Sequence, residues 1–105
     1  MDQDSQNRSV EFNLNLLRGW QRSQLRMLQE LTNKVIVPQT HLANASGSPV
    51  GSHELGGKMT ALTRSELMIK AGKDEKGQTL WQLNEDKVKK ETLGDFLKSL
   101  HLEIK

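Results

Sequence analysis

Cysteine is absent from this chain of 105 residues, and aromatic side chains make up only 4% of it. Without cysteine there is no disulfide framework and no thiolate zinc site. No apolar run approaches the roughly 20 residues of a transmembrane helix, and the polar N-terminus lacks the pattern of a signal peptide. The sequence predicts one soluble cytoplasmic domain over residues 10–105, with a disordered N-terminus at residues 1–9.

A strong excess of charge of one sign is also lacking, since the formal net charge is +2. Residues 1–33 and residues 73–105 are each neutral overall, whereas residues 34–72 carry four basic and two acidic side chains. The net charge alone is too small to indicate a nucleic-acid partner. Only the location of the basic excess, in the middle of the chain, favours one.

Apolar residues recur at helical spacing from about Phe12 to Thr32, which predicts a long first helix. Three arginines at four-residue steps would lie on the side of this helix opposite its leucines: Arg18, Arg22 and Arg26. Such a stripe is either an ordinary solvated face or a surface that contacts phosphates or a protein partner.

Two short segments follow the first helix. Residues 35–37 are β-branched and form either an extended link or a minor strand. Pro38 suits the first turn of a short helix, which Gly47 would end in a left-handed conformation. Residues 48–51, rich in Ser, Pro and Gly, then predict a turn.

A further helix is predicted from Ser52, a favourable N-cap, to Glu66. The spacing of Leu55, Met59 and Leu62 defines its buried face. Two adjacent glycines at 56 and 57 each weaken a helix by about 1 kcal/mol relative to alanine. They indicate a close approach of another backbone, a frayed first turn, or a helix that begins near residue 58.

Residues 67–83 predict a β-hairpin, because two short apolar runs flank a charged loop. The loop from Asp74 to Gly77 suits a type I turn followed by a left-handed glycine. Alternation places Trp81 and Leu83 on one face of the second strand.

A last helix is predicted over about 89–102, with four apolar residues in one stripe. Its start is either Lys89 or Thr92, and the pair of Thr92 and Asp95 is similar to a capping box.

The order of these elements resembles the winged helix-turn-helix superfamily, in the broad manner of small MarR-like and ArsR-like regulators. The run Gln39-Thr40-His41-Leu42-Ala43 at the start of one helix, a turn, and a second helix before a hairpin carry the resemblance. It implies an α+β, mostly α fold with a three-helix core, a two-stranded β-hairpin wing and a C-terminal helix.

Two features depart from that pattern. The linker at residues 45–51 is longer than the tight turn of compact helix-turn-helix proteins, which leaves the angle between the two helices open. At the tip of the wing, Asp74 and Glu75 offset Lys73 and Lys76, so the wing is less basic than a strong phosphate clamp.

The resemblance implies that the helix at 52–66 enters the major groove of double-stranded DNA and that the wing contacts the backbone. Arg64 suits a bidentate contact with guanine, Thr60 either a base or a phosphate, and Ala61 a thymine methyl group. The candidate DNA contacts are Gln39, Thr40, Ser52, His53, Gly57, Lys58, Thr60, Ala61, Arg64, Lys73 and Lys76.

Few phosphate contacts are available to one copy of the chain, so specific binding predicts a homodimer. The leucine-rich faces of residues 14–31 and 93–100 either form that dimer or pack on each other. The leading hypothesis is a DNA-binding transcriptional regulator. The alternative is a winged-helix adaptor that binds protein, with the arginine stripe facing an acidic partner.

Nothing in the sequence predicts an enzyme, a metal site or a cofactor. The spacing of His41 and His53 matches no metal motif, and no nucleophile motif is present. Gly56 and Gly57 lack the Lys-Ser/Thr ending of a phosphate-binding loop. We therefore expect binding and not catalysis.

Overall fold

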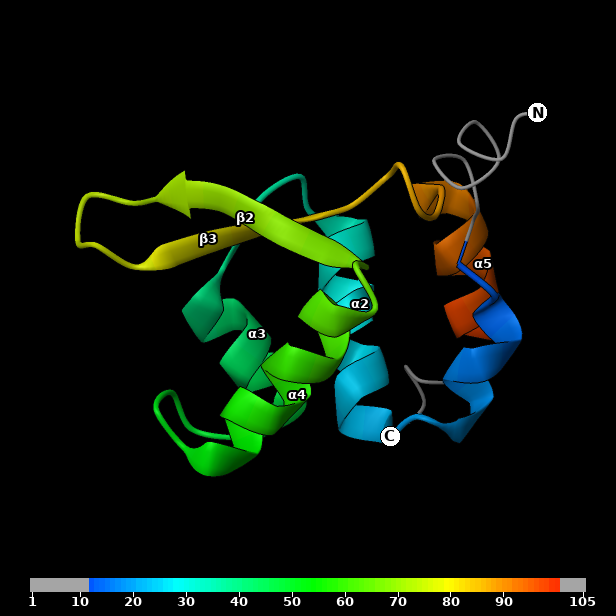
Figure 1. The fold of residues 1–105 in the computed structure, drawn as a ribbon, viewed down its shortest axis with the longest axis horizontal. Coiled ribbons are helices and arrows are strands. Elements are labelled where there is room, and N and C mark those ends of the chain that lie inside the picture. The colour runs from blue at the N-terminus through cyan, green and yellow to red at the C-terminus, as the bar shows by residue number, and fades with distance from the viewer. Residues whose placement is uncertain (1–11, 101–105) are drawn as a thin grey trace.

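The computed structural model describes residues 12–100 (Figure 1). The predicted disordered segment 1–9 and the end of the predicted last helix, beyond residue 100, lie outside the described residues. The elements follow one another as η1 (Leu14–Gly19), α2 (Arg22–Asn33), β1 (Val37–Pro38), α3 (Gln39–Ser46), α4 (His53–Arg64), β2 (Met68–Lys73), β3 (Thr79–Leu83) and α5 (Lys90–Ser99).

The predicted first helix is wrong as a single element, because it is divided after Gly19. The first part, η1, is a 3₁₀-helix whose backbone becomes extended at Trp20. A new N-terminus forms at Gln21, whose backbone N–H donates to the Gln24 side chain at 3.0 Å, while the Gln21 side chain accepts from the Gln24 backbone. This reciprocal capping stabilises a fresh start for α2 and separates Arg18 from the other two arginines.

The link after α2 contains the minor strand that was one of the two alternatives. Val37 and Pro38 pair antiparallel with β3, opposite Trp81 and Leu80. The sequence predicted Pro38 in the first turn of the helix. Pro38 is instead the extended residue before α3, with ψ of 151°. The helix ends at Gly47 with φ of +78°, which confirms the predicted stop.

The helix α4 starts where its cap predicted. The Ser52 hydroxyl accepts a hydrogen bond from the Leu55 backbone N–H at 3.1 Å, and helical residues begin at His53, not near residue 58. Gly56 and Gly57 therefore lie inside the helix. A Cβ atom added to either glycine would meet nothing within 4 Å. No packing within the described chain explains their presence.

The hairpin is confirmed and belongs to a three-stranded antiparallel sheet of order β1-β3-β2. Its turn matches the prediction, since Gly77 has φ of +83° and its N–H donates to the Asp74 carbonyl at 3.0 Å. A bulge at Ala71 shifts the register between Lys70 and Gly72. The hairpin projects to the side of the molecule away from α5 (Figure 1).

One hydrophobic core joins the helices to the inner face of the sheet. Trp81 and Leu83 are both buried, which confirms the predicted face of β3. The helix α5 lies beside α2, and Leu93 and Leu97 are buried in this contact. The predicted capping box of α5 is wrong, because the N-cap is Lys89 and Thr92 already lies within the first turn.

Candidate nucleic-acid interface

The outer face of α4 presents four exposed residues in a row, and its rotation is fixed by the buried Leu55 and Leu62 on the other face. The exposed residues are His53, Gly57, Thr60 and Arg64, as predicted, and Ala61 beside them is half-buried. This arrangement places backbone, hydroxyl and guanidinium groups along one solvent-facing surface.

Two members of this row have clear hydrogen-bonding capacity. The Thr60 hydroxyl donates to the Gly56 carbonyl at 2.8 Å, so its oxygen lone pairs remain able to accept a bond from outside. Within residues 12–100 the Arg64 side chain has no hydrogen bond or ion pair. Its five donors are therefore available to a ligand.

Ser52 and Lys58, which were predicted to hold phosphates, also support the linker between α3 and α4. The Ser52 hydroxyl donates to the Pro49 carbonyl at 2.7 Å and caps α4 at the same time. The Lys58 ammonium donates to the Ser48 hydroxyl at 2.8 Å and to the Ser46 carbonyl at 3.4 Å. These contacts, with Ser46 and Ser48 both buried, fix the path of the long linker that the sequence left open.

Gln39 and Thr40, also predicted as DNA contacts, are each bonded towards the hairpin, Gln39 through its side chain and the exposed Thr40 through its backbone. The Gln39 side-chain oxygen accepts from the Trp81 indole N–H at 3.4 Å. The Thr40 backbone N–H donates to the Gln78 side-chain oxygen at 2.7 Å. The start of α3 is thus attached to β3 and to the residue just before it.

The tip of the wing carries exposed Lys73 and Lys76 on either side of Asp74. The Asp74 carboxylate turns back into its own loop, where it accepts bonds from the Gln78 side chain and from the backbones of Gln78 and Lys76. The hydrogen bond from the Gln78 side chain is the main cause that lowers the pKa of Asp74, followed by its backbone bonds. Asp74 therefore shapes the turn, while Glu75 remains exposed.

The predicted arginine stripe is not a continuous row. Arg18, on η1, places its guanidinium 5.1 Å from the centre of the Phe96 ring on α5. Arg26, on α2, is exposed. A pocket of about 320 Å³ is lined by Arg18, Trp20, Arg22, Leu25 and Leu100.

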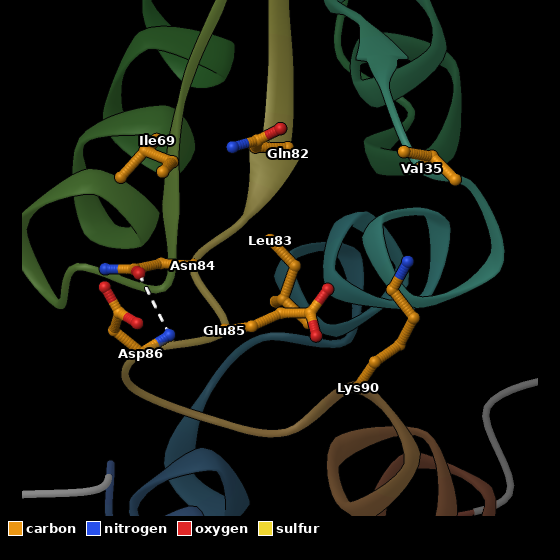
Figure 2. A pocket seen from close by; sticks show the side chains of 8 residues that line it. All are labelled: Val35, Ile69, Gln82, Leu83, Asn84, Glu85, Asp86 and Lys90. Carbon is orange, nitrogen blue, oxygen red and sulfur yellow. Dashed lines mark hydrogen bonds between the residues drawn. The ribbon is translucent and has the colours of Figure 1, made fainter. Parts of the chain in front are cut away.

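A groove beside the sheet was missed from the sequence. It has a volume of about 240 Å³ and contains exposed Val35 and Ile69, and Figure 2 shows its acidic side chains on the segment after β3. Lys90 lies on the opposite side, where its ammonium donates to the Lys34 carbonyl at 3.4 Å. The sequence signal for this groove was the β-branched run at 35–37, which contains Val35. In the structure 76% of Val35 is exposed.

Two further observations concern the described residues alone. Within 12–100, no group of three or more His, Cys, Asp or Glu side chains is arranged to hold a metal ion. None of the helices in that range is long and apolar enough to cross a membrane.

No family model matches the chain, and no curated protein matches it. Solved structures do. The MarR family transcriptional regulator SPO1453 from Silicibacter pomeroyi DSS-3 aligns with a TM-score of 0.59 and 16% identity, over 93% of this chain and 68% of its own.

Two other solved structures give the same result. The transcriptional regulator PA4135 aligns with a TM-score of 0.59 and 17% identity, over 89% of this chain and 70% of its own. NadR, solved in complex with 4-hydroxyphenylacetate, aligns with a TM-score of 0.59 and 19% identity, over 87% of this chain and 64% of its own. The chain therefore has a winged-helix fold similar to that of a MarR family regulator.

Proposed function

We propose that this protein is a transcriptional regulator that binds double-stranded DNA, with α4 in the major groove and the wing against the backbone. The observation that carries the proposal is the exposed row His53, Gly57, Thr60 and Arg64 on the helix that precedes the wing. The likeness of the fold to solved transcriptional regulators supports it. Such a regulator would act in the cytoplasm.

The charges around this row support modest affinity. Glu66, which would oppose Arg64, forms an ion pair with Lys87 at 3.0 Å. Lys58 is occupied by the linker, and Lys34 is paired with Glu30 at 3.7 Å. Four basic side chains remain near α4 and the wing: Arg64, Lys70, Lys73 and Lys76. With Arg64 on a base, phosphate contacts by the three lysines predict a salt slope of about −2.7 for one copy of the chain.

Fluorescence anisotropy with a selected duplex at two salt concentrations tests the proposal. Arg64→Ala should weaken binding by about 1–3 kcal/mol, because a bidentate base contact is lost. Arg26→Ala is the matched control, since it removes the same charge from an exposed site on α2 and should leave affinity unchanged. Equal losses in both variants would indicate general electrostatic attraction, and no binding at low salt would refute the proposal.

A homodimer through the N- and C-terminal helices is part of the proposal, because one copy makes few contacts. The leucines that suggested it largely pack on each other, with Leu17, Leu28, Leu93 and Leu97 all buried. Among the described residues of these two faces, Leu16 is the large apolar side chain that stays exposed, at 59%. Sedimentation with and without a two-half-site duplex tests the dimer. A single copy bound per duplex would contradict it.

The alternative function, a winged-helix module that binds protein, is favoured by the groove of Figure 2. Val35 and Ile69 are exposed there next to Glu85 and Asp86, and the near-neutral net charge is compatible with a protein partner. An acidic partner that meets the arginine stripe would have to contact two helices, because Arg18 lies on η1 and Arg26 on α2. Steep salt dependence of duplex binding would count against it.

A further inference from the structure

Gln78 lies between the turn of the wing and the start of α3, and both ends of its side-chain amide are engaged. Its Nε2 donates to Asp74 Oδ2 at 2.9 Å. Its Oε1 accepts from the Thr40 backbone N–H at 2.7 Å, across 38 positions of sequence. A single amide group therefore joins the wing tip to a helix of the DNA-reading unit.

The bond to Thr40 supplies an acceptor at the amino end of α3. The first N–H groups of an α-helix have no partner within the helix and are usually satisfied by a capping side chain. Here the N-cap residue is Pro38, whose side chain has no acceptor, and no capping hydrogen bond comes from it. The Gln78 oxygen supplies the missing acceptor from the wing.

The end of the Gln78 side chain that faces the wing turn is equally well defined. Asp74 Oδ1 accepts from the backbone N–H groups of Lys76 at 2.9 Å and of Gln78 at 2.8 Å. The carboxylate therefore shapes the turn, and the Gln78 amide attaches this shaped turn to α3. Beneath it, Trp81 bonds Gln39 at 3.4 Å and so attaches the strand itself.

We propose that Gln78 is a positioning residue for DNA binding, which holds Lys73 and Lys76 at a fixed place relative to α3. The role rests on the proposed function, since it concerns how the wing meets the DNA backbone. A wing that is already ordered loses less conformational freedom on binding, and this increases affinity without adding a contact. The lysines supply the charge, and Gln78 sets where that charge lies.

Reversing the polarity of the bond tests this role. Gln78→Glu keeps an acceptor for Thr40 but sets a second carboxylate against Asp74. Asp74→Asn sets a second NH2 group against the Nε2 of Gln78, so that two donors face each other. The double variant restores a donor at position 74 and an acceptor at position 78, and its net charge equals that of the wild type because one negative charge moves between the two sites.

Duplex affinity of the four full-length proteins forms a double-mutant cycle, which isolates the pairwise contribution. We expect the double variant to bind within about twofold of the wild type, and the cycle to show a coupling of about threefold to tenfold, the scale of a hydrogen bond. A double variant whose loss equals the product of the two single losses would overturn the positioning role. If the wild type itself binds no duplex, the proposed function fails and the role fails with it.

Amide hydrogen exchange gives a second readout that does not depend on DNA. In Gln78→Ala the Thr40 amide should exchange at least about fivefold faster, because its acceptor is lost. Gln82→Ala, on the strand that follows Gln78, is the matched control, since within the described chain its side chain has no hydrogen bond. Unchanged exchange at Thr40 in Gln78→Ala would overturn the proposed attachment.

Discussion

The outer face of α4 and the amino end of α3 carry similar polar groups, yet these groups differ in what they already bind. On α4, the Arg64 side chain has no partner among residues 12–100, and Thr60 keeps free lone pairs. On α3, the side chain of Gln39 and the backbone of Thr40 are bonded to the wing. A polar residue at the right place in a helix-turn-helix is therefore a stronger candidate DNA contact where the fold leaves its side chain unbonded, as at Arg64, than where the side chain already binds another residue, as at Gln39.

The largest effect on stability should come from a substitution on the buried face of α4. Leu62→Ala should lower the free energy of unfolding by about 2–5 kcal/mol, because Leu62 is fully buried and its removal leaves a cavity. Denaturant unfolding measures this loss. Thr60→Ala, on the exposed face, should change stability far less, and similar losses in both variants would show that the rotation of α4 is wrong.

Substituting Lys58 tests whether a polar residue that is already hydrogen-bonded contributes to stability and not to DNA binding. Lys58→Met keeps the aliphatic stem but removes the bonds to Ser48 and Ser46, and should cost about 1–2 kcal/mol of stability. The exposed Lys70 provides the control, Lys70→Met, which should leave stability nearly unchanged but weaken duplex binding. A Lys58→Met protein with full stability and lost binding would return Lys58 to the DNA-contacting set.

Gly57 lies on the exposed face of α4 and tests how closely a ligand approaches that face. Gly57→Ala should raise stability by about 0.5–1 kcal/mol, since alanine favours a helix and its Cβ would meet nothing within 4 Å. If DNA approaches this face closely, the same methyl group should weaken binding. Gly94→Ala on α5 is the matched control, because its Cβ also lies in open space. Higher stability with unchanged affinity in both variants would exclude a close approach at Gly57.

The smallest effect concerns the pH response of the wing turn. The pKa of Asp74 lies below its ordinary value of 3.8, chiefly because the Gln78 side chain donates to the carboxylate. Its contribution to stability is therefore present above about pH 4 and is lost as the pH falls through the lowered pKa. Titration of the Gln78 amide signal by NMR should show this transition. Asp74→Asn should abolish it, and a transition at or above pH 4 would contradict the shift.

Local chemistry made much of this fold predictable from the sequence. The turn of the hairpin follows chiefly from residues inside the loop, above all Asp74 and Gly77, and the spacing of Leu55 and Leu62 is enough to orient α4. The break before α2 was missed, because it depends on a reciprocal cap between Gln21 and Gln24, a pair that a helical apolar pattern hides.

The candidate site was predictable only where side chains point to solvent. The exposure of Arg64 follows from helical periodicity, whereas the attachment of Thr40 to Gln78 depends on a contact across 38 positions. Hydrogen bonds between distant segments form only after the chain has folded, so spacing along the sequence cannot reveal them. The role of Lys58 escaped prediction for the same reason, since its partners lie on the preceding linker.

The bulge at Ala71 has a consequence for how the molecule behaves at high concentration. The strand β2 forms an outer edge of the sheet, so its unpaired backbone groups could add a strand from another copy and start an aggregate. The extra residue, with Gly72 at φ of +111°, bends this edge, and Lys70 and Lys73 place charge along it. The wing can therefore remain exposed without becoming a template for amyloid-like growth.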